Sequence, residues 1–119
     1  MTLTKRLIGF LLLCILFSGC AQGTFHERFG RVKETMGREE VVRLLGEPDK
    51  KTDAVIPNGP FWGPQEYLTS ILHANAPYEE WQYQRKQEIF LIWFGSVEPK
   101  PKKAWKVIGK NTYPEGTVF

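Results

Sequence analysis

Cys20 is the side chain of this 119-residue sequence whose surroundings predict a defined chemical modification. It closes the run Leu16-Phe17-Ser18-Gly19-Cys20, which ends an apolar stretch that begins just after Lys5 and Arg6. A basic start, an apolar core and small residues before a cleavage site are the parts of a secretory signal. A cysteine directly after the small residues predicts attachment of diacylglycerol to its thiol and cleavage before Cys20.

This order of residues is typical of a bacterial lipoprotein, with residues 1–19 as signal peptide and 20–24 as a lipidated tether. A membrane-spanning helix is the alternative, but the apolar run falls well short of the roughly 20 residues that cross a bilayer. Each buried methylene of an acyl chain contributes about 0.8 kcal/mol, so several chains hold a protein at a membrane. Ala21 after the cysteine predicts transport to the outer membrane, where the chain faces the periplasm.

The remaining metal-binding and thiol chemistry of the sequence is sparse. His26 and His73 are its only histidines, and they show no ligand spacing. Cys14 leaves with the signal and Cys20 is lipidated, so no thiol remains for a disulfide. We therefore expect no metal and no cofactor, and we interpret both histidines as surface or packing residues.

The carboxylates do not form a catalytic pair either. Glu79 and Glu80 are adjacent and point to opposite faces of a strand, which is wrong for acid–base partners across one bond. We interpret them as solvated charges at the start of a strand. Glu39 and Glu40 lie in the first turn of a predicted helix, where the helix dipole favours them. The sequence therefore predicts a protein that is not an enzyme.

Aromatic side chains are the candidates for contact with a partner protein. Phe61 and Trp62 stand between turn-forming Pro and Gly residues, and exposed aromatics of this kind make good interface anchors. The alternative is a second small core folded over an open face of the sheet. The strand aromatics Trp81, Tyr83 and Trp93 complete the candidate partner-binding set.

A basic cluster, Lys100, Lys102 and Lys103, is a weaker candidate for contact with anionic lipid head groups. The alternative is a solvated hairpin loop, since charges that flank strands also deter edge aggregation. Without Lys5 and Arg6 the chain is close to neutral, so nucleic-acid binding has no electrostatic support.

The predicted elements form one small domain over residues 25–119. Phe25, Phe29, Val32 and Met36 recur on one helical face. A second helix is expected from about Arg38 to Leu45, with Gly37 as N-cap, Gly46 as C-cap and Pro48 preventing its continuation.

The rest of the chain predicts a long connection and then a β-meander. An insertion at about 54–80 contains one short helix that begins near Pro64 and carries Tyr67, Leu68, Ile71 and Leu72. Strands are predicted at 81–84, 89–94 and 104–108. Both faces of 89–94 are apolar, so two covers are needed: the helix pair, and either the insertion or a partner protein.

These elements resemble a known family. Met36-Gly37-Arg38-Glu39-Glu40-Val41, Leu44-Leu45-Gly46-Glu47-Pro48, Trp81-Gln82-Tyr83 and the 90–94 strand are similar to motifs of the SmpA/OmlA (BamE-like) outer-membrane lipoproteins. The resemblance implies an α+β fold in which two short helices pack on a three-stranded antiparallel sheet, in the order ααβββ. The insertion precedes the first of these strands.

The same resemblance implies a non-catalytic scaffold or accessory subunit in outer-membrane or envelope assembly, with the β-barrel assembly machinery as partner. The alternative function is a lipid-tethered inhibitor or binding module for a soluble envelope enzyme, because a doubled form of this architecture resembles a secreted inhibitor of β-lactamases.

Overall fold

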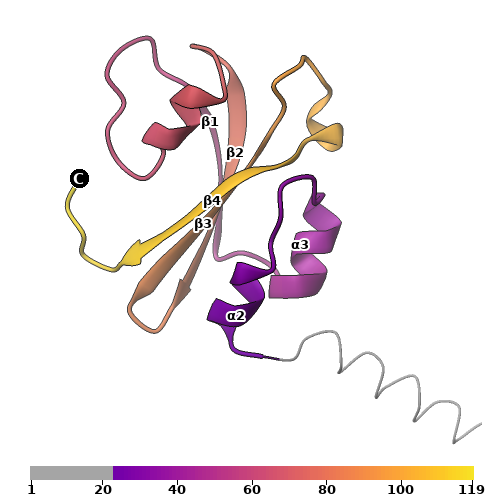
Figure 1. The fold of residues 1–119 in the computed structure, drawn as a ribbon, viewed down its shortest axis with the longest axis vertical. Helices are drawn as coiled ribbons and strands as arrows, with labels where there is room; N and C mark the ends of the chain where they lie inside the picture. The colour runs from indigo at the N-terminus through magenta and orange to yellow at the C-terminus, as the bar shows by residue number, and fades with distance from the viewer. Residues whose placement is uncertain (1–22) are drawn as a thin grey trace, which may run out of the picture.

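The computed structural model describes residues 23–119. The predicted signal peptide and the lipidation of Cys20 lie outside the described residues. No helix within 23–119 is long and apolar enough to cross a bilayer. Two α-helices come first in this region and are followed by a four-stranded antiparallel sheet (Figure 1). The helices are α2 (Phe25–Gly30) and α3 (Arg38–Leu45), and the strands are β1 (Lys50–Val55), β2 (Pro77–Arg85), β3 (Glu88–Gly95) and β4 (Lys106–Pro114).

The order of strands in the sheet, β1-β2-β3-β4, follows the order of the chain. The prediction of an α+β fold is confirmed, but the prediction of three strands is wrong. Strand β1 pairs with β2 along its whole length, from Lys50 opposite Gln82 to Val55 opposite Pro77. Its sequence lacks apolar alternation because it is an edge strand, and its charges (Lys50, Lys51 and Asp53) face solvent. Hydropathy therefore gave no sign of it.

The insertion lies between β1 and β2, at residues 56–76, and is shorter than the predicted 54–80 because both of its ends are strand. The predicted short helix is present as the 3-10 helix η1 (Glu66–Ser70). A second 3-10 helix, η2 (Lys102–Ala104), lies in the connection from β3 to β4. The strands predicted at 81–84 and 89–94 are longer than expected, and the strand predicted at 104–108 begins two residues later, at Lys106, and extends to Pro114.

The two helices form one layer over the sheet. Helix α3 has the predicted bounds: Gly37 is the N-cap, its N–H donates to Glu40, and Gly46 ends the helix at φ 86°. Helix α2 ends at Gly30, so Val32 and Met36 lie beyond it in an irregular segment, although both still contact the core. Helix periodicity overestimated α2 because a connecting segment continues the same apolar spacing.

The sheet separates two hydrophobic cores. The helix-side core contains Phe29, Val41, Leu45, Trp81, Tyr83, Phe90, Ile92 and Phe94. The insertion-side core contains Ile56, Leu68, Leu72, Tyr78, Ile89, Leu91 and Trp93. Every residue of β3 from Ile89 to Gly95 is buried, so the prediction that both faces of this strand are covered is confirmed. Figure 1 shows α2 and α3 on one side of the sheet and the insertion with η1 on the other.

Candidate functional site

The predicted partner-binding aromatics do not share one surface. Trp81 and Tyr83 are fully buried in the helix-side core, and Trp93 is fully buried in the insertion-side core. Phe61 is partly buried against the insertion-side core. Trp62 differs from the other four, since 73% of its surface is exposed. Of the five side chains, four therefore contribute to packing, and Trp62 alone is free to contact a partner.

The adjacent carboxylates Glu79 and Glu80 do point to opposite faces of the sheet, as predicted, but they are not solvated strand-leading charges. On the helix side, the indole N–H of Trp81 donates to Glu79 Oε1 at 2.7 Å. On the insertion side, the indole N–H of Trp93 donates to Glu80 Oε1 at 2.8 Å. Each glutamate thus satisfies the buried indole of its own core, which would otherwise lose a hydrogen bond.

The two carboxylates differ in their other partners. Glu79 is buried and also accepts a hydrogen bond from Arg38 Nε at 2.8 Å, while Lys102 Nζ lies 3.2 Å from its second oxygen. Burial alone raises the pKa of Glu79, but the hydrogen bonds from Arg38, Trp81 and Lys102 outweigh it and hold the pKa below its usual range. Glu80 is half-buried, and its second hydrogen-bond donor is the neutral amide of Gln65 at 2.7 Å.

The three lysines of the predicted lipid-contact cluster also differ in their partners. Lys102 is committed to an ion-pair network with Asp53 and Glu79, which raises its pKa. Lys100 and Lys103 are exposed on the connection between β3 and β4. Only these two remain available for contact with lipid head groups.

The two histidines are far apart in sequence and both exposed. His26 lies edge-on to Phe90, with Nε2 3.8 Å from a carboxylate oxygen of Glu88. His73 Nδ1 lies 2.8 Å from the carbonyl oxygen of Ala74. In the region that the structure describes, no three His, Cys, Asp or Glu side chains come together as a metal site.

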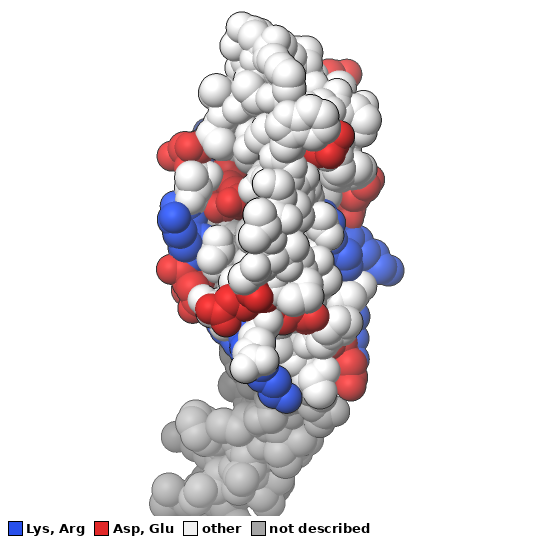
Figure 2. All heavy atoms as spheres, turned by 90° about the vertical axis from the view of Figure 1, so that its left-hand side faces the viewer, with Lys and Arg blue, Asp and Glu red and all other residues white. Residues whose placement is uncertain are grey.

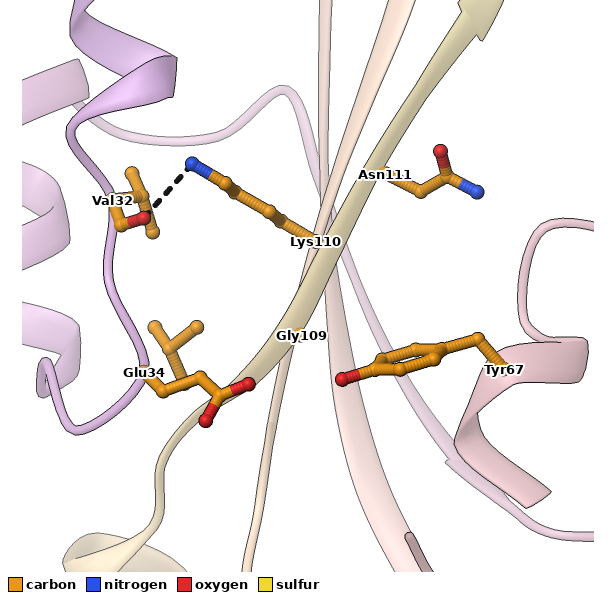
Figure 3. A pocket seen from close by; sticks show the side chains of 7 residues that line it. Val32, Glu34, Tyr67, Gly109, Lys110 and Asn111 are labelled. Carbon is orange, nitrogen blue, oxygen red and sulfur yellow. Dashed lines mark hydrogen bonds between the residues drawn. The ribbon is translucent and has the colours of Figure 1, made fainter. Parts of the chain in front are cut away.

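A groove of about 400 Å³ runs along β4, between the irregular segment after α2 and the 3-10 helix η1 (Figure 3). Its floor is Gly109, where an added Cβ would lie 2.5 Å from the ring of Tyr67. Lys110 points away from the groove centre, and its ammonium group donates to the carbonyl oxygens of Phe29, Gly30 and Val32. Partial burial lowers the pKa of Lys110.

Two groove residues, Lys110 and Tyr67, each attach a covering layer to strand β4. Lys110 caps the carbonyl end of α2, as cations commonly do at helix C-termini. The ring of Tyr67 approaches the backbone at Gly109 closely, and its hydroxyl donates to the carbonyl oxygen of Ile108 at 3.4 Å. The polar groups of the groove are therefore largely engaged in holding the two layers together.

The outer surface of the insertion offers more to a partner. It includes Trp62, and Tyr67, five residues further along the chain, is 46% exposed. The end of the chain packs against the same layer: the Phe119 ring lies 5.1 Å from that of Tyr113 and next to Gly63. We call the exposed side chains of this surface the insertion face: Trp62, Glu66, Tyr67, Val118 and Phe119.

The insertion face is almost uncharged. Residues 52–84 contain no Lys or Arg, and residues 56–76 contain Glu66 as their one acidic residue. Figure 2 shows this side of the molecule: an uncharged strip occupies the upper and central part of the view, with charged side chains on both sides of it and acidic side chains at its lower end. This absence of basic residues was readable from the sequence and would have singled out the insertion.

Comparison of the chain with protein-family models, curated proteins and solved structures found no match. The resemblance drawn from the sequence motifs therefore stays a prediction.

Proposed function

We propose that this protein is a lipid-anchored envelope protein that acts by binding another protein, as a scaffold or accessory subunit in outer-membrane assembly. The observation that carries the proposal is Trp62, a tryptophan with 73% of its surface exposed in a layer whose large aliphatic residues Ile56, Leu68 and Leu72 are buried. Tryptophan is strongly enriched among residues that dominate binding energy at protein interfaces.

Two further observations support a binding role. The insertion face has few charged groups to desolvate, and charged residues are depleted at the centres of protein interfaces. The predicted lipid anchor at Cys20 precedes a short tether, which would keep the whole domain at the membrane surface. The assignment to outer-membrane assembly comes from the motif resemblance.

The test is crosslinking in intact cells, followed by mild detergent extraction and mass spectrometry of the proteins recovered. The affinity tag belongs in the tether after Gln22, because a C-terminal tag would disturb Phe119, which packs near Gly63. The proposal predicts near-stoichiometric recovery of barrel-assembly proteins, with recovery reduced by Trp62→Ala.

One control variant and two alternative outcomes decide how this experiment is interpreted. Cys20→Ala should lose the anchor and identifies neighbours that depend on membrane attachment alone. Recovery of one soluble envelope enzyme instead would support the inhibitor alternative and overturn the assembly role. Recovery of barrel-assembly proteins that Trp62→Ala leaves unchanged would move the interface away from the insertion face.

A further inference from the structure

Among the described residues, Lys and Arg side chains lie over aromatic rings on the helix side of the sheet and not on the insertion side. On the helix side, Arg38 lies over Phe94 at 5.2 Å, Lys51 lies over Trp81 at 4.8 Å, and similar pairs involve Phe25, Phe29, Tyr83 and Trp105. On the insertion side, no described Lys or Arg lies over an aromatic ring. The rings there include the exposed Trp62, Tyr67 and Phe119.

The carboxylates show the same asymmetry. Asp53 and Glu79 form ion pairs with Lys102, and Glu79 also pairs with Arg38, all from the helix side. Glu66 is exposed, and no described residue forms an ion pair with it. Glu80 accepts hydrogen bonds from the neutral donors Gln65 and Trp93. Glu66 and Glu80 of the insertion side thus form no ion pair with a basic side chain of the described chain.

Local geometry brings the backbone of Glu66, whose carboxylate has no ion-pair partner among the described residues, back toward the segment that carries Trp62. Gly63 adopts φ +116°, a conformation that side chains disfavour, and the N–H of Glu66 donates to the carbonyl oxygen of Gly63 at 3.1 Å. This turn brings Glu66 back toward the residue that follows Trp62, because its ends lie within about 7 Å of each other. An incoming cation could therefore meet both a carboxylate and the face of an indole ring.

From this charge complementarity we propose that the insertion face binds a segment of a partner protein in which Lys or Arg stands beside aliphatic side chains. The basic side chain contacts Trp62 and Glu66, and the aliphatic side chains cover Tyr67 and Phe119. This inference rests on the proposed binding function and names the chemistry of the partner. An anionic membrane surface would instead meet Glu66, a carboxylate that forms no ion pair with a described basic side chain.

The test uses the full lipidated protein in a nonionic detergent, applied to an array of immobilised nonapeptides. The probes alternate Leu with Arg, Lys, Gln or Glu, so they differ only in charge. We expect binding to the Arg and Lys probes and at least tenfold weaker binding to the Glu probe. Equal binding to the Arg and Glu probes would overturn the proposal.

Three variants assign this binding to the insertion face. We expect Trp62→Ala to weaken binding of the Arg probe about tenfold, through loss of an aromatic anchor and its cation–π contact. We expect Glu66→Lys to weaken it about fivefold. Glu47→Lys makes the same charge change at an exposed position after α3 and should stay within about twofold of the parent protein. Binding that Trp62→Ala leaves unchanged would overturn the proposal.

Collisional quenching tests the electrostatic premise separately. Trp62 is exposed, whereas Trp81, Trp93 and Trp105 are buried, so ionic quenchers report mainly on Trp62. We expect caesium to quench more strongly than iodide, relative to their effects on free tryptophan, and Glu66→Gln to reduce this preference. Stronger quenching by iodide would contradict the premise. If the parent protein does not bind the Arg probe but still recovers barrel-assembly proteins in the crosslinking experiment, this inference is rejected and the proposed function stands.

A membrane control completes the design. Vesicles of phosphatidylglycerol and phosphatidylethanolamine are mixed with the Cys20→Ala chain, which has no lipid anchor of its own. The proposal predicts no Trp62-dependent binding. Binding that Trp62→Ala abolishes would show that the face takes an anionic membrane surface, which would overturn the proposal.

Discussion

The helix layer and the insertion layer cover opposite faces of the same sheet by different chemistry. The helix layer adds ion pairs and cation–π contacts to its apolar core, and the side chains of Arg38, Lys102 and Lys110 reach across it to the sheet or to α2. The insertion layer has an apolar core of its own, and a neutral hydrogen bond from Gln65 attaches it to Glu80 of β2.

The difference shows that a layer can cover a sheet face without ion pairs when apolar packing and neutral hydrogen bonds hold it in place. It also separates two tasks. The helix layer balances its own charges internally, whereas the insertion layer leaves an aromatic and a carboxylate without a cationic partner in the described chain. A layer whose buried charge is paired within the domain is suited to stability. A layer with an exposed aromatic ring and an unpaired carboxylate is suited to recognition of a partner.

The largest expected effect comes from the same truncation in each layer. Leu45→Ala on the helix side and Leu68→Ala in η1 both remove a buried side chain, and each should lower the free energy of unfolding by about 3 kcal/mol. Urea unfolding followed by circular dichroism measures both. A cost below about 1 kcal/mol for Leu68→Ala would show that the insertion layer is peripheral to stability.

The paired glutamates should respond unequally. Glu79→Gln leaves Arg38 and Lys102 facing a neutral amide, and we expect a loss of about 2 kcal/mol. Glu80→Gln keeps an acceptor for its two neutral donors and should cost below about 1 kcal/mol. Urea midpoints at neutral pH decide between them, and equal losses would remove the electrostatic contrast between the layers.

Acid should weaken the helix layer through the same residue. The pKa of Glu79 is lower in the folded protein than in the unfolded chain, so its contribution to stability is complete above the unfolded value of about 4.3. That contribution is lost as the pH falls toward the lower folded-state pKa. Glu79→Gln should therefore flatten the dependence of the unfolding midpoint on pH between about 5 and 3. An unchanged slope would contradict this assignment.

Gly109→Ala tests the contact between the insertion layer and β4. The new Cβ would collide with the Tyr67 ring, which must swing away, and we expect a loss of about 1 kcal/mol. The closest clash is with Tyr67, while Trp93 lies 3.3 Å from the new Cβ, so in a Tyr67→Ala background Gly109→Ala should lose most of its cost. A full double-mutant cycle by thermal unfolding measures this coupling. If the stability losses of the two single variants simply add in the double variant, the cost of Gly109→Ala does not come from its contact with Tyr67.

Trp62→Ala should have the smallest effect on stability, within about 0.5 kcal/mol, because its side chain is largely exposed. The matched substitution Phe61→Ala should cost more, since Phe61 packs against the insertion-side core. Differential scanning calorimetry of the two variants compares them directly. A large loss for Trp62→Ala would mean that this residue packs in solution.

Much of the fold was readable from local patterns. The bounds of α3 followed from its caps, and the two covered faces of β3 followed from six consecutive apolar residues, Ile89 to Phe94. The missed strand, β1, is held by backbone hydrogen bonds to β2 and has a polar sequence. Such pairing leaves no mark on hydropathy.

The candidate site was harder to predict, because it depends on residues far apart in the chain. Glu79 is buried only because Arg38 and Lys102 meet it from two other segments. The four tryptophans look alike in sequence, yet three are buried and Trp62 is exposed. Whether a tryptophan is buried depends on the layer that packs against it, and this packing is visible only in the folded structure.

The strand order also has a consequence for how this chain folds. Because neighbours in the sheet are neighbours in the sequence, every pairing can form as a hairpin without threading one strand between others. Strands β2 and β3 are joined through Lys86 and Gln87, with Lys86 at φ 55°, and this shortest closure costs the least loop entropy. Strand β1 joins across residues 56–76, a longer loop. A nascent hairpin of β2 and β3 would therefore expose apolar side chains on both faces until the helices and the insertion close over it.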